Sequence, residues 1–228
     1  MKFLDKKLIL FDLDGTLIDS VPDLSLAVNH MLSSLGKSEF EEETIRHWVG
    51  NGAKTLVERA LSGYEEIDKH LDPSYGEKAL DIFLTFYAHN LSRSTYAYPH
   101  VVTTLWALKN SGFTLAIITN KPYCFIAPIL KELKMDILFD YCIGGDSLQE
   151  KKPHPLPLIH VCETLNIPKE HAVMIGDSKN DILAAQKAEI SSIAVTYGYN
   201  YNEEIGTYSP DKIVDNFADI LALLDTKK

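Results

Sequence analysis

The chain has 228 residues, more than one typical domain of roughly 100 to 200 residues and fewer than two, which favours a core with a smaller insert. Hydrophobic residues make up 46% and charged residues 24%, close to globular averages, so the composition excludes a disordered, collagen-like or coiled-coil chain. The 22 Lys and Arg against 32 Asp and Glu give a net charge of −10, which argues against non-specific binding to nucleic acid or to anionic lipid. Taken alone, the same charge disfavours an anionic substrate.

Five short apolar runs predict the strands of a sheet. Each run is followed by a polar cluster, and strands alternating with helical patterns are typical of a parallel α/β sheet. The runs are almost uniformly apolar, which indicates strands covered by helices on both faces. We therefore expect an α/β protein with a Rossmann-like parallel sheet. The predicted strands are residues 8–12, 113–119, 141–145, 171–177 and 191–195.

The long stretch between the first and second runs contains only helical patterns. Apolar residues recur at i, i+3 and i+4 in three segments, 21–36, 53–61 and 80–91. We expect an all-helical domain inserted at residues 18–92, and an α/β core formed by residues 1–17 and 93–228.

Cysteine usage and the apolar runs indicate the compartment. Cys124, Cys142 and Cys162 are an odd number without a Cys-x-x-Cys pair. The first residues contain acids where a signal peptide needs an apolar stretch, and no run approaches the roughly 18 apolar residues of a membrane span. We expect a reduced, cytoplasmic protein that binds neither nucleic acid nor membrane and forms a monomer or a weak homodimer.

Polar segments follow four of the predicted strands. Ligands bind beyond the carboxyl ends of the strands in an open parallel sheet. Clustered carboxylates resist ionisation unless a cation neutralises them, and oxygen ligands without His or Cys select Mg²⁺, which also takes a phosphate oxygen. We therefore expect a Mg²⁺ site that binds a phosphate ester. The segments, in chain order, are Asp12-Leu-Asp-Gly-Thr16, Thr119-Asn-Lys-Pro122, Lys151-Lys-Pro153 and Gly176-Asp-Ser-Lys-Asn-Asp181.

The first segment contains the expected catalytic pair. Asp12 is the expected nucleophile, because it ends a buried strand and can form an aspartyl-phosphate without first losing a proton. Asp14 points the same way if the backbone stays extended, so we expect it to protonate the leaving alkoxide and then to deprotonate water. Gly15 lets the chain turn where a Cβ would crowd the phosphate.

The other segments offer groups for the phosphate and the metal. We expect the Thr119 hydroxyl and the Lys152 charge to contact the phosphoryl group. Asp177 is the expected metal ligand. Asp181, one helical turn later, either ligates through water or holds Lys152.

Each segment also has a purely structural interpretation. The first is compatible with a strand-ending turn whose Asp caps a helix, and Asp177 and Asp181 with a helix cap and a first-turn acid. A shared site is favoured because all four segments fall on one predicted edge of the sheet.

These segments resemble the four motifs of the haloacid dehalogenase superfamily of aspartyl phosphatases, and the resemblance covers essentially the whole chain. It implies that Asp12 is the nucleophile and a Mg²⁺ ligand, that Asp14 is the general acid and base and binds the metal through its backbone carbonyl, and that Asp177 completes the protein ligands. The helical insert resembles a small cap that closes over the site and excludes water.

Further strings resemble the bacterial phosphoglycolate phosphatases, which implies 2-phosphoglycolate as the substrate. Amides at the helix start after Gly50 would suit the carboxylate of a small acid, with Lys54 or Arg46 adding charge. The alternative is a simple turn in which Asn51 caps the helix. The strings are residues 49–53, 57–61, 118–122, 151–155 and 196–201, and the expected substrate contacts are Thr119, Asn120, Lys152, Asn51, Gly52 and Lys54.

Three other functions remain open at this point. They are a sugar phosphomutase on the same core, a phosphatase for another small ester or pyrophosphate, and a non-catalytic phosphate-binding protein. A dehalogenase is disfavoured, because carbon–halogen displacement needs no leaving-group acid such as Asp14. Bound Mg²⁺ and Lys152 can reverse the local sign of the charge, so the net charge of −10 does not exclude a small phosphate.

Overall fold

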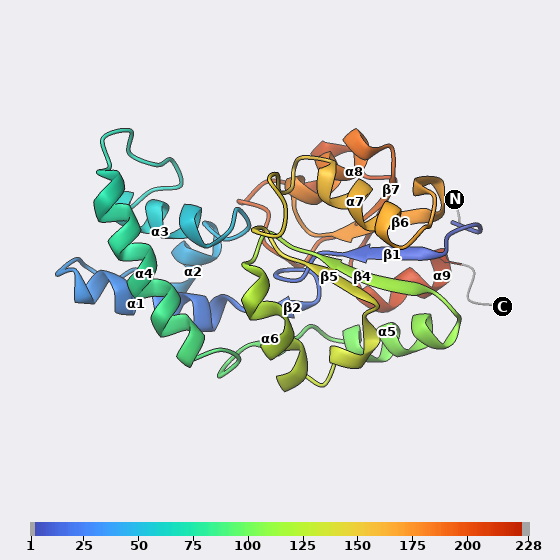
Figure 1. Cartoon of the computed structure of the whole chain (residues 1–228), viewed down its shortest axis with the longest axis horizontal. Helices are drawn as coiled ribbons and strands as arrows, with labels where there is room; N and C mark the ends of the chain where they lie inside the picture. The colour runs from blue at the N-terminus through green and yellow to red at the C-terminus, as the bar shows by residue number, and fades with distance from the viewer. Residues whose placement is uncertain (1–2, 225–228) are drawn as a thin grey trace.

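A computed structural model describes residues 3–224. Six parallel strands form its central sheet in the order β5-β4-β1-β6-β7-β8 (Figure 1). This confirms the expected α/β fold with a parallel sheet. The strands are β1 (Leu8–Phe11), β4 (Thr114–Ile118), β5 (Tyr141–Ile143), β6 (Ala172–Gly176), β7 (Ser191–Val195) and β8 (Lys212–Val214).

Helices cover both faces of the sheet, as the apolar strands predict. Successive side chains of a strand point to opposite faces. Ile9 and Phe11 pack with α5, α6 and α9, while Leu8 and Leu10 pack with α7 and α8. The helices are α5 (Val101–Asn110), α6 (Ile126–Glu132), α7 (Leu156–Thr164), α8 (Lys179–Ala188) and α9 (Ile220–Leu223).

The register of the central strands aligns their carboxyl ends. Phe11 of β1 lies opposite Ile117 of β4 and Ile175 of β6. The polar residues that follow each strand therefore start at the same level of the sheet.

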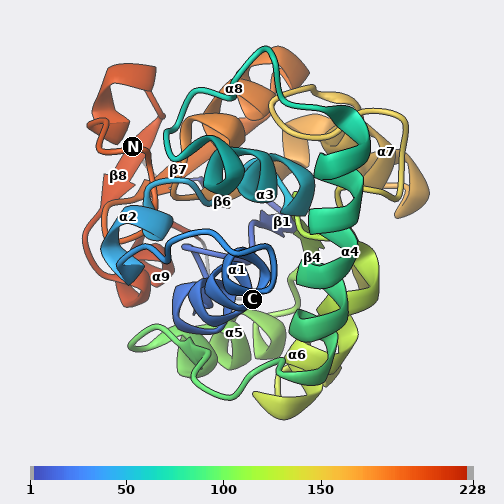
Figure 2. The ribbon, with the colours of Figure 1, turned by 90° about the vertical axis from the view of Figure 1, so that its left-hand side faces the viewer.

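Helices α1 to α4 lie beyond this edge of the sheet (Figures 1 and 2). Leu24, Val28 and Met31 of α1 are buried at the expected helical spacing. Helix α4 begins seven residues earlier than the predicted start at Leu80, because Asp72 caps it by accepting from the Ser74 amide. The bounds are α1 (Val21–Ser34), α2 (Glu42–Arg46), α3 (Ala53–Ser62) and α4 (Pro73–His89).

Several short elements were not predicted from the sequence. Strands β2 (Ile18–Asp19) and β3 (Tyr96–Ala97) pair antiparallel where the chain enters and leaves the helical segment. These strands have two residues each, and the edge strand β8 begins with the charged Lys212, so none of them gives an apolar run. Single 3₁₀ turns occupy Tyr123–Phe125, Asp136–Leu138, Lys169–His171, Ile205–Tyr208 and Phe217–Asp219.

Across residues 3–224, no helix is both long and apolar enough to cross a membrane.

Candidate active site

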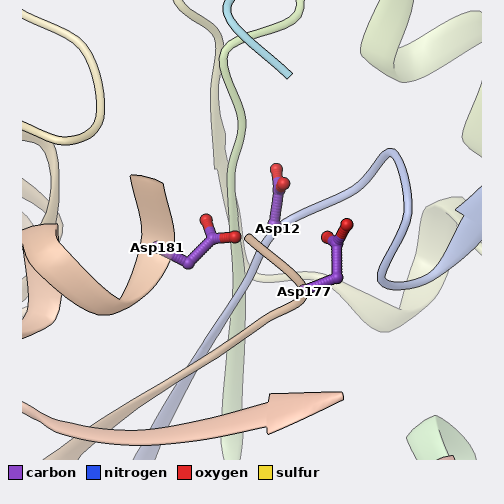
Figure 3. A group of neighbouring side chains, drawn as sticks. All are labelled: Asp12, Asp177 and Asp181. Atoms are coloured by element: carbon purple, nitrogen blue, oxygen red, sulfur yellow. The ribbon is translucent and has the colours of Figure 1, made fainter. Parts of the chain in front are cut away.

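Three carboxylates meet at the carboxyl edge of the sheet (Figure 3). Asp12 follows β1, Asp177 follows β6, and Asp181 lies in the first turn of α8. One oxygen from each lies within 4.8 Å of the others. The three residues are 9%, 2% and 0% exposed. The aligned strand ends therefore bring together acids that are far apart in the sequence.

The turn after Asp12 requires a glycine. Gly15 has φ +90°, a conformation that residues with a Cβ rarely adopt. A Cβ there would lie 2.2 Å from Asp177 Oδ2. The expected role of Gly15 in a tight turn is confirmed, but the group that a side chain would meet is the Asp177 carboxylate.

Asp177 is fixed by two hydrogen bonds. The Thr16 hydroxyl donates to Oδ1 at 2.7 Å, and the Tyr199 amide donates to Oδ2 at 2.7 Å. Burial, followed by the neighbouring charges of Asp181 and Asp12, raises the pKa of the Asp177 carboxyl well above its usual range. The geometry thus holds an acid in a place that disfavours its charged form.

Lys152 lies between two of the acids. Its ammonium is 2.9 Å from Asp12 Oδ1 and 2.6 Å from Asp181 Oδ1. The amide and the hydroxyl of Ser178 both donate to Asp181 Oδ2. Of the two alternatives for Asp181, the structure shows the one in which it holds Lys152.

The donor set fits a hard cation. Burial raises the pKa of Asp12 to about 7; the Lys152 charge opposes this effect and the Asp181 charge adds to it. Asp12 Oδ1 is also a buried oxygen without a well-directed hydrogen bond, although Lys152 lies near it. Oxygen ligands of this kind suit Mg²⁺. Asp12 and Asp177 would hold the ion through their carboxylates, and Asp14 is expected to do so through its backbone carbonyl.

Replacing Asp177 by Asn tests this fit through stability. We expect the metal-free variant to melt roughly 2–4 °C above wild type, because one of three crowded buried charges is removed. Saturating Mg²⁺ should raise the Tm of wild type and leave the Tm of D177N nearly unchanged. Thermal melts with Mg²⁺ or EDTA measure both effects. Asp5→Asn, at a carboxylate 67% exposed, is the matched control. Equal stabilisation of D177N and wild type by Mg²⁺ would remove Asp177 from the metal site.

A small cavity opens beside the carboxylates. It has a volume of about 40 Å³, and Asp12, Asp14 and Thr119 line it. The Thr119 hydroxyl oxygen accepts from the Lys121 amide, so its proton is free to be donated to a phosphate oxygen. The opposite wall is mostly apolar and comes from α1, α3, α4 and the turn before α6: Leu24, Leu56, Phe83, Tyr87 and Phe125.

Asp14 is held inside this cavity by two groups. The Lys121 ammonium lies 2.9 Å from Oδ1 and 3.2 Å from Oδ2. The Ser20 hydroxyl donates to Oδ1. Asp14 thus shares the cavity with Asp12, as the expected pairing of nucleophile and general acid requires.

Polar side chains that follow the sheet strands hold the loop before α3 against the site. The Gly50 carbonyl accepts from Asn120 Nδ2 at 2.9 Å and from Asn180 Nδ2 at 3.2 Å. Lys151 Nζ donates to the Asn51 carbonyl at 2.6 Å. Gly50 has φ +123°, and a Cβ on it would lie 2.4 Å from the Tyr201 hydroxyl. These hydrogen bonds therefore fix the loop against the residues that follow the strands.

Of the six residues expected to bind substrate, Lys152 lies between Asp12 and Asp181 and does not line the cavity, and the other five divide into two groups. Thr119, Asn120 and Gly52 line the cavity. The Asn51 side chain instead accepts from the Tyr201 hydroxyl, and the Lys54 side chain is 71% exposed and pairs with Glu58 at 3.8 Å.

Two expectations for the α3 region differ from the structure. Gly52 is the N-cap of α3 and receives no side-chain cap, so the alternative that Asn51 caps this helix is wrong. Arg46 pairs at 2.9 Å with Asp19, the second residue of β2, and does not line the cavity.

Several contacts of the site were not predicted from the sequence. Lys121 directly follows the predicted Thr119-Asn120 pair, which was the available signal. Tyr199 and Tyr201 follow β7, and applying the strand-end rule to that strand as well would have placed them at this edge.

Comparison with known proteins adds the family. A model of the haloacid dehalogenase-like hydrolases matches residues 9–195. The chain belongs to this family. A protein of Colwellia psychrerythraea named phosphoglycolate phosphatase is 54% identical, with 98% of this chain and 99% of the relative covered. A Pseudomonas aeruginosa protein named phosphoglycolate phosphatase 1 is 45% identical over 96% of this chain and 80% of the relative.

A solved structure agrees with this assignment. The crystal structure of a predicted phosphoglycolate phosphatase from Haemophilus somnus superposes with a TM-score of 0.90 at 41% identity, with 96% of this chain and 97% of that chain covered. The four sequence motifs predicted this family, and the comparisons confirm it.

Proposed function

We propose that this protein is a Mg²⁺-dependent phosphomonoester hydrolase that converts 2-phosphoglycolate into glycolate and phosphate through an aspartyl-phosphate on Asp12. The observation that carries the proposal is that Asp12 and Asp14 face one small cavity whose wall is otherwise mostly apolar. The names of the relatives at 54% and 45% identity support the substrate.

The residues of the site divide the reaction into two steps. In the first, an Asp12 oxygen attacks phosphorus, and the departing glycolate oxygen takes a proton from Asp14. In the second, Asp14 takes a proton from a water that attacks the aspartyl-phosphate, which releases phosphate and restores Asp12. Lys152 and Thr119 contact the phosphoryl oxygens. Mg²⁺, when bound, neutralises the charge gathered by the carboxylates and the phosphoryl group.

We propose that residues 18–92 form a cap on a core of residues 1–17 and 93–228. The β2–β3 pair lies where the chain passes between the two parts. The hydrogen bonds to Gly50 and Asn51 close the cap loop over the site. Closure of this kind excludes water while the acyl phosphate exists.

The charge of the site supports a dependence on metal. Four acids, Asp12, Asp14, Asp177 and Asp181, face two ammonium groups, those of Lys121 and Lys152. Without a divalent cation this site repels a phosphate dianion. We therefore expect hydrolysis to stop on addition of EDTA and to return with Mg²⁺.

A sugar phosphomutase is the second candidate that the shared core suggests. The cavity wall opposite the carboxylates is mostly apolar and offers few groups for sugar hydroxyls. Phosphatase activity on another small ester or on pyrophosphate is compatible with the same cavity. The substrate panel described next separates these activities from hydrolysis of 2-phosphoglycolate.

A substrate panel tests the proposal. Phosphate release is measured from 2-phosphoglycolate, hexose phosphates, nucleotides and pyrophosphate, with and without Mg²⁺. We expect 2-phosphoglycolate to have the highest kcat/KM, by about tenfold or more. A tenfold preference for another ester would overturn the substrate, and conversion of glucose 1-phosphate to glucose 6-phosphate would indicate the mutase.

We further propose a cytoplasmic protein, monomeric or weakly dimeric, whose partner is a small phosphorylated metabolite. Its three cysteines are unpaired, as expected in a reducing compartment.

A further inference from the structure

Lys121 is a buried cation at the wall of the cavity. Its side chain is 3% exposed, and its ammonium makes two well-directed hydrogen bonds, both to oxygens of Asp14, and a less well-directed one to the Tyr87 hydroxyl. An ammonium has three donors. The third donor has only the Tyr87 hydroxyl oxygen as a poorly directed partner, so an acceptor in the cavity can share it.

Asp14 is the one carboxylate that forms an ion pair with this ammonium among the described residues. Tyr87, whose ring centroid lies 5.0 Å from Lys121 Nζ, is 1% exposed, and its hydroxyl has no well-directed hydrogen bond in the described chain. Burial raises the pKa of Tyr87 to about 12, so the hydroxyl stays protonated and can donate. A cation and a free hydroxyl donor thus lie side by side at an otherwise apolar wall, a pair suited to a carboxylate.

The other basic groups near the site do not line the cavity. Lys152 lies between Asp12 and Asp181, and Lys151 donates to the backbone of the loop before α3. Of the described side chains that line the cavity, Lys121 is the single cation.

We propose that Lys121 binds the carboxylate of the substrate, with the Tyr87 hydroxyl as second donor, and thereby selects small phosphorylated acids over neutral esters of the same size. This inference rests on the proposed function. It differs from the sequence expectation, which gave the carboxylate to the start of α3 with Lys54 or Arg46 adding charge.

The order of the groups matches the order of atoms in a two-carbon acid ester. Asp12 is placed to attack phosphorus, and Asp14 is placed to protonate the ester oxygen. Lys121 contacts Asp14 and lines the same cavity. In 2-phosphoglycolate the carboxylate is joined to the ester oxygen through one methylene carbon, so Lys121 lies where the carboxylate would reach.

A pair of esters separates recognition of the carboxylate from the chemistry. The probes are 2-phosphoglycolate and 2-hydroxyethyl phosphate, which has a hydroxymethyl group in place of the carboxylate. We expect wild type to prefer the acid by roughly 10- to 100-fold in kcat/KM, the range of a hydrogen bond to a charged group. In Lys121→Met the ratio of the two kcat/KM values should fall to near one, and Lys121→Gln, which keeps a polar contact with Asp14, should give the same ratio.

Inhibitor binding gives a readout that does not depend on Asp14 chemistry. The Ki of 3-phosphonopropionate is compared with that of propylphosphonate, since neither has an ester bond to hydrolyse. Wild type should bind the carboxylate-bearing inhibitor more tightly, and K121M and K121Q should lose the difference. Circular dichroism and thermal melts confirm that each variant is folded. Lys169→Met, at a surface lysine paired with Glu189, is the matched control and should keep the preference.

The outcomes are distinguishable. If wild type shows no preference for the acid ester, the proposed substrate fails. If wild type prefers the acid and folded K121M and K121Q retain that preference, the role of Lys121 is overturned while the proposed function stands. If both Lys121 variants lower kcat/KM equally for the two esters and keep the wild-type difference between the two Ki values, Lys121 only positions Asp14. If Lys54→Met abolishes the preference instead, the carboxylate belongs to Lys54.

Discussion

Replacing Asp12 by Asn is expected to lower kcat/KM for 2-phosphoglycolate by at least ~10⁴-fold, because the amide cannot form the aspartyl-phosphate. Phosphate release from purified enzyme in saturating Mg²⁺ measures this loss. The fold should survive, since Lys152 keeps its ion pair with Asp181 when the charge of Asp12 is removed.

The Asp12 variant needs a folding control. We expect the metal-free D12N protein to melt at or above the wild-type temperature, because burial and the Asp181 charge already disfavour the ionised Asp12 carboxyl. Substantial turnover by folded D12N would exclude Asp12 as the nucleophile and, with it, the covalent mechanism.

Replacing Asp14 by Asn is expected to lower kcat/KM for 2-phosphoglycolate by about 10²–10⁴-fold, since Asp14 protonates the leaving oxygen and later activates water. With p-nitrophenyl phosphate the leaving group is a stable anion that needs little protonation. The first step of D14N should then be affected much less than the second.

This difference predicts a burst. D14N mixed with p-nitrophenyl phosphate should release up to one equivalent of nitrophenol rapidly and then turn over slowly, and the intact mass of the protein should show one added phosphoryl group. Wild type should show neither feature to the same extent. If D14N loses kcat/KM equally on both esters and no phosphorylated protein forms, Asp14 does not carry out either proton transfer.

The fold was predictable where the signal is local and long enough. The runs that became β1, β4, β5, β6 and β7 are apolar because helices cover both faces, and this pattern can be read without knowing the neighbours of each strand. Strands β2 and β3 have only two residues each, and β8 begins with the charged Lys212, so none of the three forms an apolar run and all were missed. Their pairing is decided by the strands beside them.

The site was predictable in its acids and less so in its contacts. Asp12, Asp14 and Asp177 follow predicted strands, and the rule for parallel sheets places them at one edge. Lys54 and Asn51 were expected to face the substrate from the start of α3, but the positions of their side chains depend on how the loop packs on the core. That packing joins Gly50 to Asn120 and Asn180, residues 70 and 130 positions away.

The sequence by itself determined the chemistry: which strand ends carry acids, a hydroxyl and lysines, and therefore that a cation and a phosphate suit this edge. Only the tertiary structure decided the partners. It pairs Lys152 with Asp12 and Asp181, and it pairs Lys121 with Asp14 across 107 positions. The physical reason is that the type of a strand or helix follows from residues a few positions apart, whereas the neighbour of a buried charge depends on strand register and on the packing of the helical segment over the sheet.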